Sequence, residues 1–331
     1  MINNLPTRTP PIVLYLYHAY PLSIIFTQED KILPWFYSNF LQISCRYDSK
    51  NDEKWFDFDS YQLPPNLSAE VHTRNYLKHA INGSIETLFD LIDQSKYIYT
   101  FLNEYYTKGN RNFNKRHVSH DILIHGYNKT EGYLICSGFY NRIYNDNMII
   151  PIDLFVASIM DDECFYPYHN HVTFYSLDRN EEINFDLKKV MNDTMNYINS
   201  IGDSSSNSPT QSSIYGINVY NSLINRSSEF LDKGFLDIRP YHLFFEHKNT
   251  LNSRLSYMFT NKIISFDKRL YDHSNNLKNA IAVIRNLALK VSLSHQTNEI
   301  PLIMKLLTQA KQAEKTFFET FLDKLSKSVE Y

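Results

Sequence analysis

The sequence predicts an α+β protein in which a mixed N-terminal half is followed by a helical C-terminal half. Three β-prone runs at residues 96–106, 119–127 and 133–140 are separated by polar turns, a pattern typical of an antiparallel meander. Beyond the last expected strand the hydrophobic residues recur at helical spacing. The length of 331 residues suits one large domain or two modest ones. We therefore expect a catalytic-type α+β domain at residues 1–180 and a mainly helical region at residues 181–331.

The other elements follow from shorter patterns. Strands are expected at residues 12–17, 41–47, 55–61 and 171–177. Pro21 is compatible with the first turn of a helix that starts near Ala19 or Tyr20. Further helices are expected at residues 71–80, 85–92, 152–160, 185–201, 214–231, 240–264, 277–294 and 302–329, with a Ser-rich loop at 202–213. On the helix at 240–264, the triplet Glu246-His247-Lys248 is expected to form a solvated charged face.

The composition excludes several function classes. Lys and Arg total 33 and Asp and Glu total 36, so a basic nucleic-acid footprint is not expected. The chain has only 8 glycines and neither of the two Gly-rich phosphate-binding motifs. No apolar run is long enough for a membrane span, and the first residues do not resemble a signal peptide. Three cysteines without paired spacing favour a cytoplasmic location.

His120 is the candidate catalytic base. It stands at the start of the strand expected at 119–127, where a side chain can project into a cleft at the sheet edge. In papain-like cysteine hydrolases an Asp or Asn on the next strand orients such a histidine, because the base must hold one tautomer. The corresponding position here is Ser137, whose hydroxyl stabilises an imidazolium less than a carboxylate does. The competing interpretation is that His120 merely caps the start of a strand and has no catalytic role.

The nucleophile that such a histidine needs is missing from the sequence. Cys45 and Cys136 fall within expected strands, where a small buried cysteine is usually part of the core, and Cys164 follows the histidine. A nucleophilic cysteine is expected at a helix start, because the helix dipole and a nearby histidine lower the pKa of the thiol. The one segment with that context, at residues 18–21, carries Ala19.

Five segments carry a resemblance to a known family. They are HAYPLSIIF with LPWFYSNFLQI, YIYTFLNEYYTKG, HDILIHGYN, YLICSGFY and RPYHLFFEHK, which span positions 18 to 248. The chain resembles cysteine-peptidase-like (papain-like) acyltransferases of nonribosomal and thiotemplated biosynthetic clusters, which are similar to the amino-terminal domain of butirosin biosynthesis protein H. The family's first motif has cysteine where this chain has Ala19. Its histidine corresponds to His120 and its acid to Ser137, where this chain departs from the pattern.

The resemblance implies a papain-like fold and an activity. A cysteine at position 19 would take an acyl group from the phosphopantetheine arm of an acyl or peptidyl carrier protein and pass it to a small amine, forming an amide. It implies no cofactor bound by the enzyme itself. Hydrolysis by a peptidase or thioesterase of the same fold is the first alternative. A natively inactive binding protein is the second, whereas the retained neighbours of Ala19 favour a Cys→Ala substitution in an active enzyme.

Two further groups of residues could bind a metal ion or a partner. Cys164, His169 and His171 lie close in the sequence, but their spacing is irregular and a fourth ligand is not evident, so no metal site is expected. Lys115-Arg116 either contacts an acidic carrier protein or is ordinary surface charge.

Overall fold

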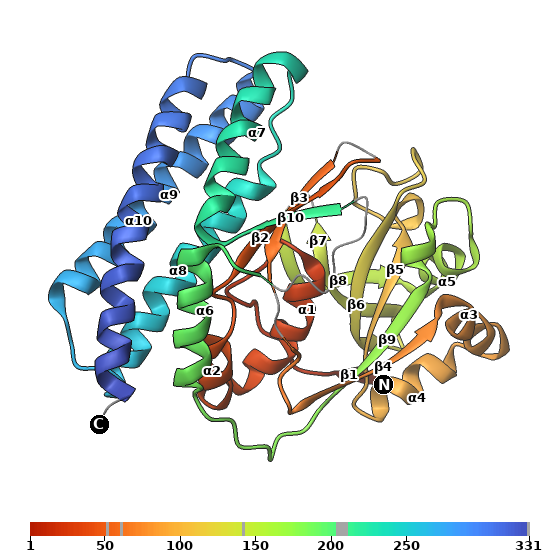
Figure 1. The fold of residues 1–331 in the computed structure, drawn as a ribbon. Helices are drawn as coiled ribbons and strands as arrows, with labels where there is room; N and C mark the ends of the chain where they lie inside the picture. The colour runs from red at the N-terminus through yellow and green to blue at the C-terminus, as the bar shows by residue number, and fades with distance from the viewer. Residues whose placement is uncertain (51–52, 60–61, 141–142, 203–210, 330–331) are drawn as a thin grey trace. The chain divides into compact units, whose positions relative to one another are not determined.

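The computed structural model describes residues 1–331 except 51–52, 60–61, 141–142, 203–210 and 330–331 (Figure 1). The chain divides into two compact units. The first comprises residues 1–32 and 63–183, and the second comprises residues 33–62 and 184–331. Both units contain α-helices together with an antiparallel sheet, so the expected α+β class is confirmed.

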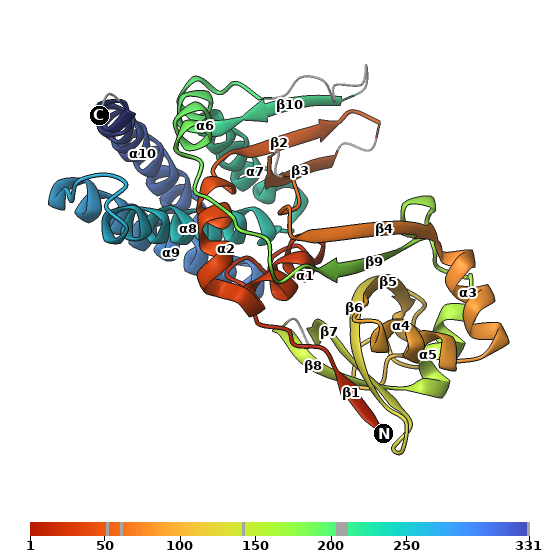
Figure 2. The ribbon, with the colours of Figure 1, turned by 90° about the horizontal axis from the view of Figure 1, so that it is seen from below.

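A seven-stranded antiparallel sheet forms the centre of the first unit (Figures 1 and 2). Its order is β4-β9-β5-β6-β7-β8, and β1 pairs with the end of β6. The expected meander is confirmed as β5-β6-β7. It is extended by β8, a strand hidden in the sequence by its polar centre, Asn145-Asp146-Asn147. The strands are β1 (Ile2–Asn4), β4 (Leu67–Thr73), β5 (Tyr97–Asn103), β6 (Ser119–Asn128), β7 (Tyr133–Tyr140), β8 (Ile143–Pro151) and β9 (His171–Leu177).

Three helices cover one face of this sheet: α3 (Arg74–Gly83), α4 (Glu86–Asp93) and α5 (Ile152–Met160). Their apolar residues form one buried cluster with side chains from β5 to β9. The helix expected at residues 71–80 therefore starts later than expected, because residues up to Thr73 pair with β9 as part of β4. Short 3₁₀ turns lie at Phe26–Gln28 (η1), Glu104–Tyr106 (η2) and Pro167–His169 (η3).

Helix α1 (Leu16–Ile25) packs on the opposite face of the sheet. The Tyr20 ring lies 5.4 Å from that of Tyr99, which alternates along β5 with the core residue Ile98. The strand expected at residues 12–17 and the helix start expected at Ala19 or Tyr20 are both wrong, since the helix begins at Leu16. Nearly every residue of α1 is buried, so its continuous apolar run carries no helical period that a sequence could reveal.

The second unit combines a three-stranded sheet with long helices. The sheet has the order β10-β2-β3, with β2 (Ile43–Asp48), β3 (Glu53–Phe58) and β10 (Gln211–Tyr215). Because β10 pairs with β2, residues 33–62 belong to this unit and not to the domain expected at 1–180. The loop expected at 202–213 lies mostly outside the described residues, and its end forms part of β10.

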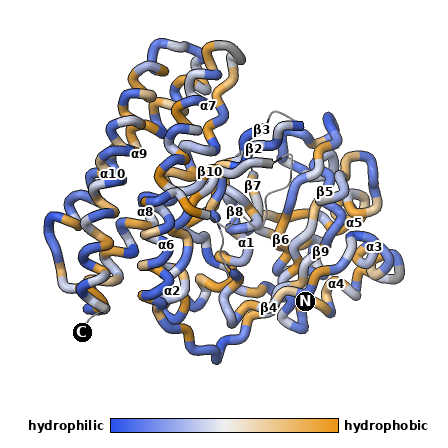
Figure 3. The backbone as a smooth tube through the Cα atoms, in the orientation of Figure 1, coloured by the Kyte–Doolittle hydropathy of each residue, from blue (hydrophilic) through white to orange (hydrophobic). Residues whose placement is uncertain are grey.

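Hydrophobic and hydrophilic residues are interspersed along the helices of the second unit (Figure 3). None of the helices in the described ranges is both long and apolar enough to cross a membrane. The division between the units falls within α2 (Glu29–Ser38), and a short turn, η5 (Gly216–Asn218), precedes α7. The remaining helices are α6 (Leu187–Asn199), α7 (Val219–Lys233), α8 (Arg239–Thr260), α9 (Lys268–Ser294) and α10 (Ile300–Val329).

A buried ionic cluster lies among these helices. Lys248 and Glu314 form an ion pair, and both side chains are fully buried. Tyr197 donates a hydrogen bond of 2.8 Å to Glu314, and Lys248 Nζ lies 2.6 Å from Nδ1 of His247. The solvated face expected for residues 246–248 is therefore wrong, because all three side chains are buried. Charged residues of an expected helix can face inward where the fold supplies partners.

Candidate active site

His120 forms a close pair with the next residue of β6. Its Nδ1 atom lies 3.1 Å from Oδ1 of Asp121 and 3.3 Å from the Asp121 carbonyl oxygen. The surroundings of the ring remove water and by themselves lower its pKa. The hydrogen bond and negative charge of Asp121 outweigh this effect and raise the pKa of His120 to about 9. The imidazole is 39% exposed, so it can meet a group that arrives from solvent.

The cavity beside His120 is small. It holds about 20 Å³ and is lined by Leu102, Glu104, Thr107, Asn110, His120, Asp121, Ile122, Gly138, Phe139 and Met148. Glu104 accepts hydrogen bonds from Asn110 and Asn112, which fixes the loop at 107–118 over this end of the sheet. The cavity has room for about one water molecule.

Ala19 lies in the first turns of α1 and has no exposed surface. Its backbone N–H donates to the Tyr15 carbonyl at 3.0 Å, close to the positive end of the helix dipole. The next residue, Tyr20, donates from its hydroxyl to the Asp121 carbonyl at 2.9 Å. The residue after Ala19 is thus bonded to the residue after His120, which fixes this part of α1 on β6.

Ser137 does not take part in the His120 pair. It lies opposite Leu123 in the β6-β7 ladder, three residues from His120, and its side chain is fully buried. Its hydroxyl interacts with the Tyr144 hydroxyl and not with the His120 ring. The geometry therefore gives the orienting role to Asp121, and His120 keeps the charged partner that the sequence seemed to lack. Asp121 adjoins His120 in the sequence, but strand alternation predicts opposite faces for neighbours.

The three cysteines are poor nucleophiles. Burial raises the pKa of Cys136 and raises that of Cys45 to about 11. Burial and the nearby Asp161 carboxylate raise the pKa of Cys164 to about 11, although Arg74 acts in the opposite direction. Each thiol therefore stays protonated at neutral pH, so no described cysteine replaces a nucleophile at position 19.

Two other histidines lie on or near β6. His117 stacks on Tyr105, with ring centroids 4.2 Å apart, and its Nδ1 lies 2.7 Å from the Asn103 amide nitrogen. His125 is fully buried, and its Nδ1 lies 3.0 Å from Asn4 Oδ1. Burial lowers the pKa of His125 to about 4. His125 is therefore neutral at pH 7 and out of reach of solvent, which leaves His117 as the competitor of His120.

One group of side chains in the described ranges could hold a metal ion. The ligand atoms of His117, Asp161 and Glu163 lie within 4.8 Å of one another. Sequence reasoning missed this group, because 44 residues separate His117 from Asp161 in the chain. Cys164, His169 and His171 do not form such a group in the described part of the molecule. The His169 ring stacks on Phe101 instead, with ring centroids 4.4 Å apart.

Comparison with known proteins adds no family assignment. No protein-family model matches the chain, and no curated protein matches it at a significant level. The resemblance carried by residues 18–248 therefore stays a hypothesis. The structure pairs His120 with Asp121 and joins α1 to β6 through the Tyr20 hydroxyl and the Asp121 carbonyl oxygen, but the residues that line the cavity at His120 include none from α1.

Proposed function

We propose that this protein, with cysteine at position 19, is a papain-like amide-forming acyltransferase. The observation that carries the proposal is the His120–Asp121 pair on β6, fixed to α1 through the hydroxyl of Tyr20. A histidine whose pKa is raised by a carboxylate stabilises a neighbouring thiolate as an ion pair. The first turns of a helix favour negative charge on the same thiol.

The chemistry follows from this pair. The position-19 thiolate, paired with the protonated His120 ring, attacks the carbonyl carbon of a carrier-bound acyl thioester. The bond to the carrier sulfur breaks, and the imidazolium returns its proton to that sulfur. An amine then attacks the acyl-enzyme, neutral His120 accepts its proton, and the bond to the position-19 sulfur breaks to release an amide. The acyl group is already activated as a thioester, so ATP is not needed.

A basic loop beside His120 supports the choice of a carrier protein as acyl donor. The segment 107–118 contains Lys108, Arg111, Lys115 and Arg116 and no acidic residue, and all four side chains are exposed. Thr107 and Asn110 of the same loop line the cavity at His120. Positive charge at the site entrance attracts an acidic partner and raises its association rate.

The test is to install the nucleophile and identify the product. The Ala19→Cys variant is incubated with an acyl-loaded carrier protein and a primary amine, and products are identified by mass spectrometry. We expect an acyl-enzyme adduct and then an amide, both lost in the additional variant His120→Ala. His117→Ala is the matched control, because His117 also lies near the start of β6. Release of the free acid alone would favour the hydrolase alternative, and absence of any adduct would contradict the whole assignment.

A second candidate is a binding protein that never had the nucleophile. The observation that favours it is Ala19 itself, whose methyl group is fully buried. A cysteine codon at position 19 in the native gene excludes this candidate. An alanine codon, together with tight binding of an acyl-carrier by the unmodified chain, supports it.

A further inference from the structure

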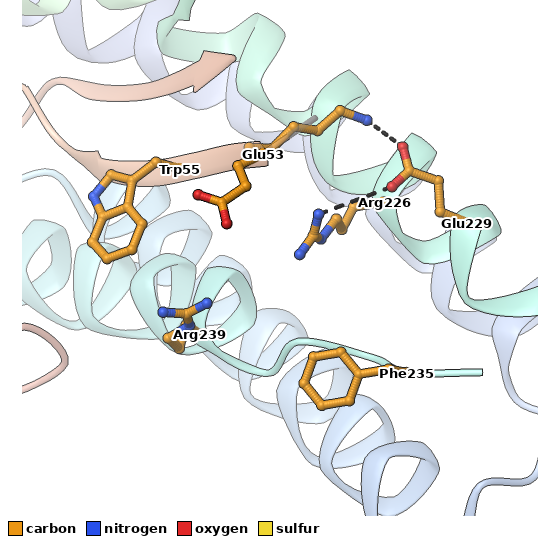
Figure 4. A pocket seen from close by; sticks show the side chains of 7 residues that line it. Glu53, Trp55, Arg226, Glu229, Phe235 and Arg239 are labelled. Atoms are coloured by element: carbon orange, nitrogen blue, oxygen red, sulfur yellow. Dashed lines mark hydrogen bonds and ion pairs between the residues drawn. The ribbon is translucent and has the colours of Figure 1, made fainter. Parts of the chain in front are cut away.

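A charged cavity in the second unit is separate from the residues of the proposed acyl-transfer site. It has a volume of about 410 Å³ and is lined by Glu53, Lys54, Trp55, Arg226, Glu229, Phe235 and Arg239. This volume lies within the range of small-molecule sites in proteins, about 300–1,000 Å³. Residues of β3, of α7 and of the start of α8 converge there (Figure 4).

The two guanidinium groups are held in place by a buried carboxylate. Arg239 forms bonds of 3.0 Å and 2.9 Å to the two oxygens of Asp237, and Arg226 lies 3.7 Å from the same carboxylate. Glu229 pairs with both Lys54 and Arg226 on the opposite side of the cavity. Such clamps orient the guanidinium planes before a ligand arrives and so reduce the entropy lost on binding.

Charges of opposite sign face the same space. In Figure 4 the Glu53 carboxylate and the guanidinium groups of Arg226 and Arg239 point toward the middle of the cavity. Glu229 and Asp237 partly neutralise the three basic side chains. The site therefore presents a separated positive and negative surface, and not a uniformly basic one.

Two aromatic rings supply apolar walls. Trp55 is 38% exposed and Phe235 is 68% exposed, so both rings are accessible to a ligand in the cavity. The Arg239 guanidinium lies 5.3 Å from the centre of the Trp55 ring, which keeps the indole beside the charged groups. A ligand could thus place charged groups on Arg226, Arg239 and Glu53 and an apolar group against the rings.

We propose that this cavity binds a zwitterionic α-amino acid with an apolar side chain. The carboxylate of the ligand is bound by Arg226 and Arg239, its ammonium group by Glu53, and its side chain by Trp55 and Phe235. A purely anionic molecule makes no ion pair with Glu53, and a purely cationic molecule makes none with Arg226 or Arg239.

Three related probes test this assignment: L-phenylalanine, 3-phenylpropionate, which lacks the ammonium group, and phenethylamine, which lacks the carboxylate. Binding is followed by the fluorescence of Trp55 and by saturation-transfer NMR of the probe. We expect L-phenylalanine to bind at least about tenfold more tightly than either analogue. Trp55→Phe should abolish the fluorescence response and keep the NMR signal, because an aromatic wall remains.

Variants separate the roles of the charged groups. Arg226→Gln and Arg239→Gln should each weaken L-phenylalanine binding by about tenfold or more. Glu53→Gln should reduce the preference for L-phenylalanine over 3-phenylpropionate. Arg285→Gln is the matched control, because Arg285 also lies over an aromatic ring, 5.1 Å from the centre of Phe245, and does not line the cavity. Equal binding of all three probes, or binding unaffected by the two arginine variants, would overturn the proposal, as would no saturable signal in either measurement.

Discussion

Nδ1 of His120 lies 3.1 Å from Oδ1 of Asp121, its immediate neighbour on β6. Adjacent strand residues usually point to opposite faces, so this contact depends on its place at the end of the strand. The carboxylate keeps the imidazole protonated near neutral pH, which is the state that pairs with a thiolate. Five predictions follow from this pair and from other buried groups, and a sixth follows from the exposed loop at 107–118.

The protonation of His120 can be measured directly in the unmodified chain. An NMR titration of its imidazole should give a pKa of about 9, and Asp121→Asn should lower that pKa because the charged partner is lost. The raised pKa stabilises the folded state below the ordinary value of 6.5, and this contribution disappears as pH rises through about 9. An unchanged titration in Asp121→Asn would show that another group holds the proton.

The thiol of Ala19→Cys should have a pKa below that of free cysteine. Position 19 is buried, so alkylation by iodoacetamide will be slow in absolute rate. Its pH dependence still reports the thiolate fraction, because restricted access scales the rate equally at every pH. We expect His120→Ala in the same background to shift the alkylation profile to higher pH. A profile like that of free cysteine in both variants contradicts the nucleophile assignment.

Ser137 and Asp121 should differ sharply in their effect on turnover in the Ala19→Cys background. Asp121→Asn should reduce the rate with a thioester substrate and move the pH–rate profile, since it removes both orientation and charge. Ser137→Ala should leave the profile in place, because its buried hydroxyl interacts with Tyr144 and not with His120. A shift caused by Ser137→Ala would return the orienting role to this serine.

His125 should make the protein less stable in mild acid. Its Nε2 atom is buried without a hydrogen-bond partner in the described structure, so a second proton would place an unpaired charge in the core. The pKa of His125 is 6.5 in the unfolded chain and about 4 in the folded protein. Stability is therefore lost as pH falls through this window, by about 3 kcal/mol. Urea unfolding of His125→Gln should show a smaller decline over the same pH range.

The buried pair of Lys248 and Glu314 should show strong coupling. Removing one partner leaves an uncompensated buried charge, so Lys248→Met or Glu314→Gln alone should cost about 3–5 kcal/mol of unfolding free energy. The double variant should be much less destabilised than the sum of the two. Chemical unfolding in a double-mutant cycle measures this difference, and additive effects would mean that the two groups do not act as a pair.

The proposed contact of the loop at 107–118 with a carrier protein can be tested by charge reversal. Lys115→Glu in the Ala19→Cys background should raise KM for an acyl-loaded carrier and leave turnover of a small acyl thioester unchanged. The effect should decrease at high salt, because screening weakens interactions between exposed charges. Lys305→Glu, which reverses an exposed lysine of α10, is the matched control. Equal effects of both variants would contradict a specific role of the loop.

The sequence by itself determined the elements whose signals are local. The meander β5-β6-β7 and the succession of long C-terminal helices follow from hydrophobic periodicity and turn residues. His120 also stood out in the sequence, because its residue type and its place at a strand start need no distant partner to be recognised.

Only the tertiary structure decided which residues meet. Pairing of β10 with β2 assigns residues 33–62 to the second unit, although the paired residues Ser212 and Tyr47 lie 165 positions apart in the chain. Lys248 was expected on a solvated face of its helix, but it pairs with Glu314 and both side chains are buried. The contact of His120 with Asp121 depends on side-chain directions at the end of a strand. Periodicity describes one element at a time, whereas burial and charge pairing are set by neighbours that are distant in sequence.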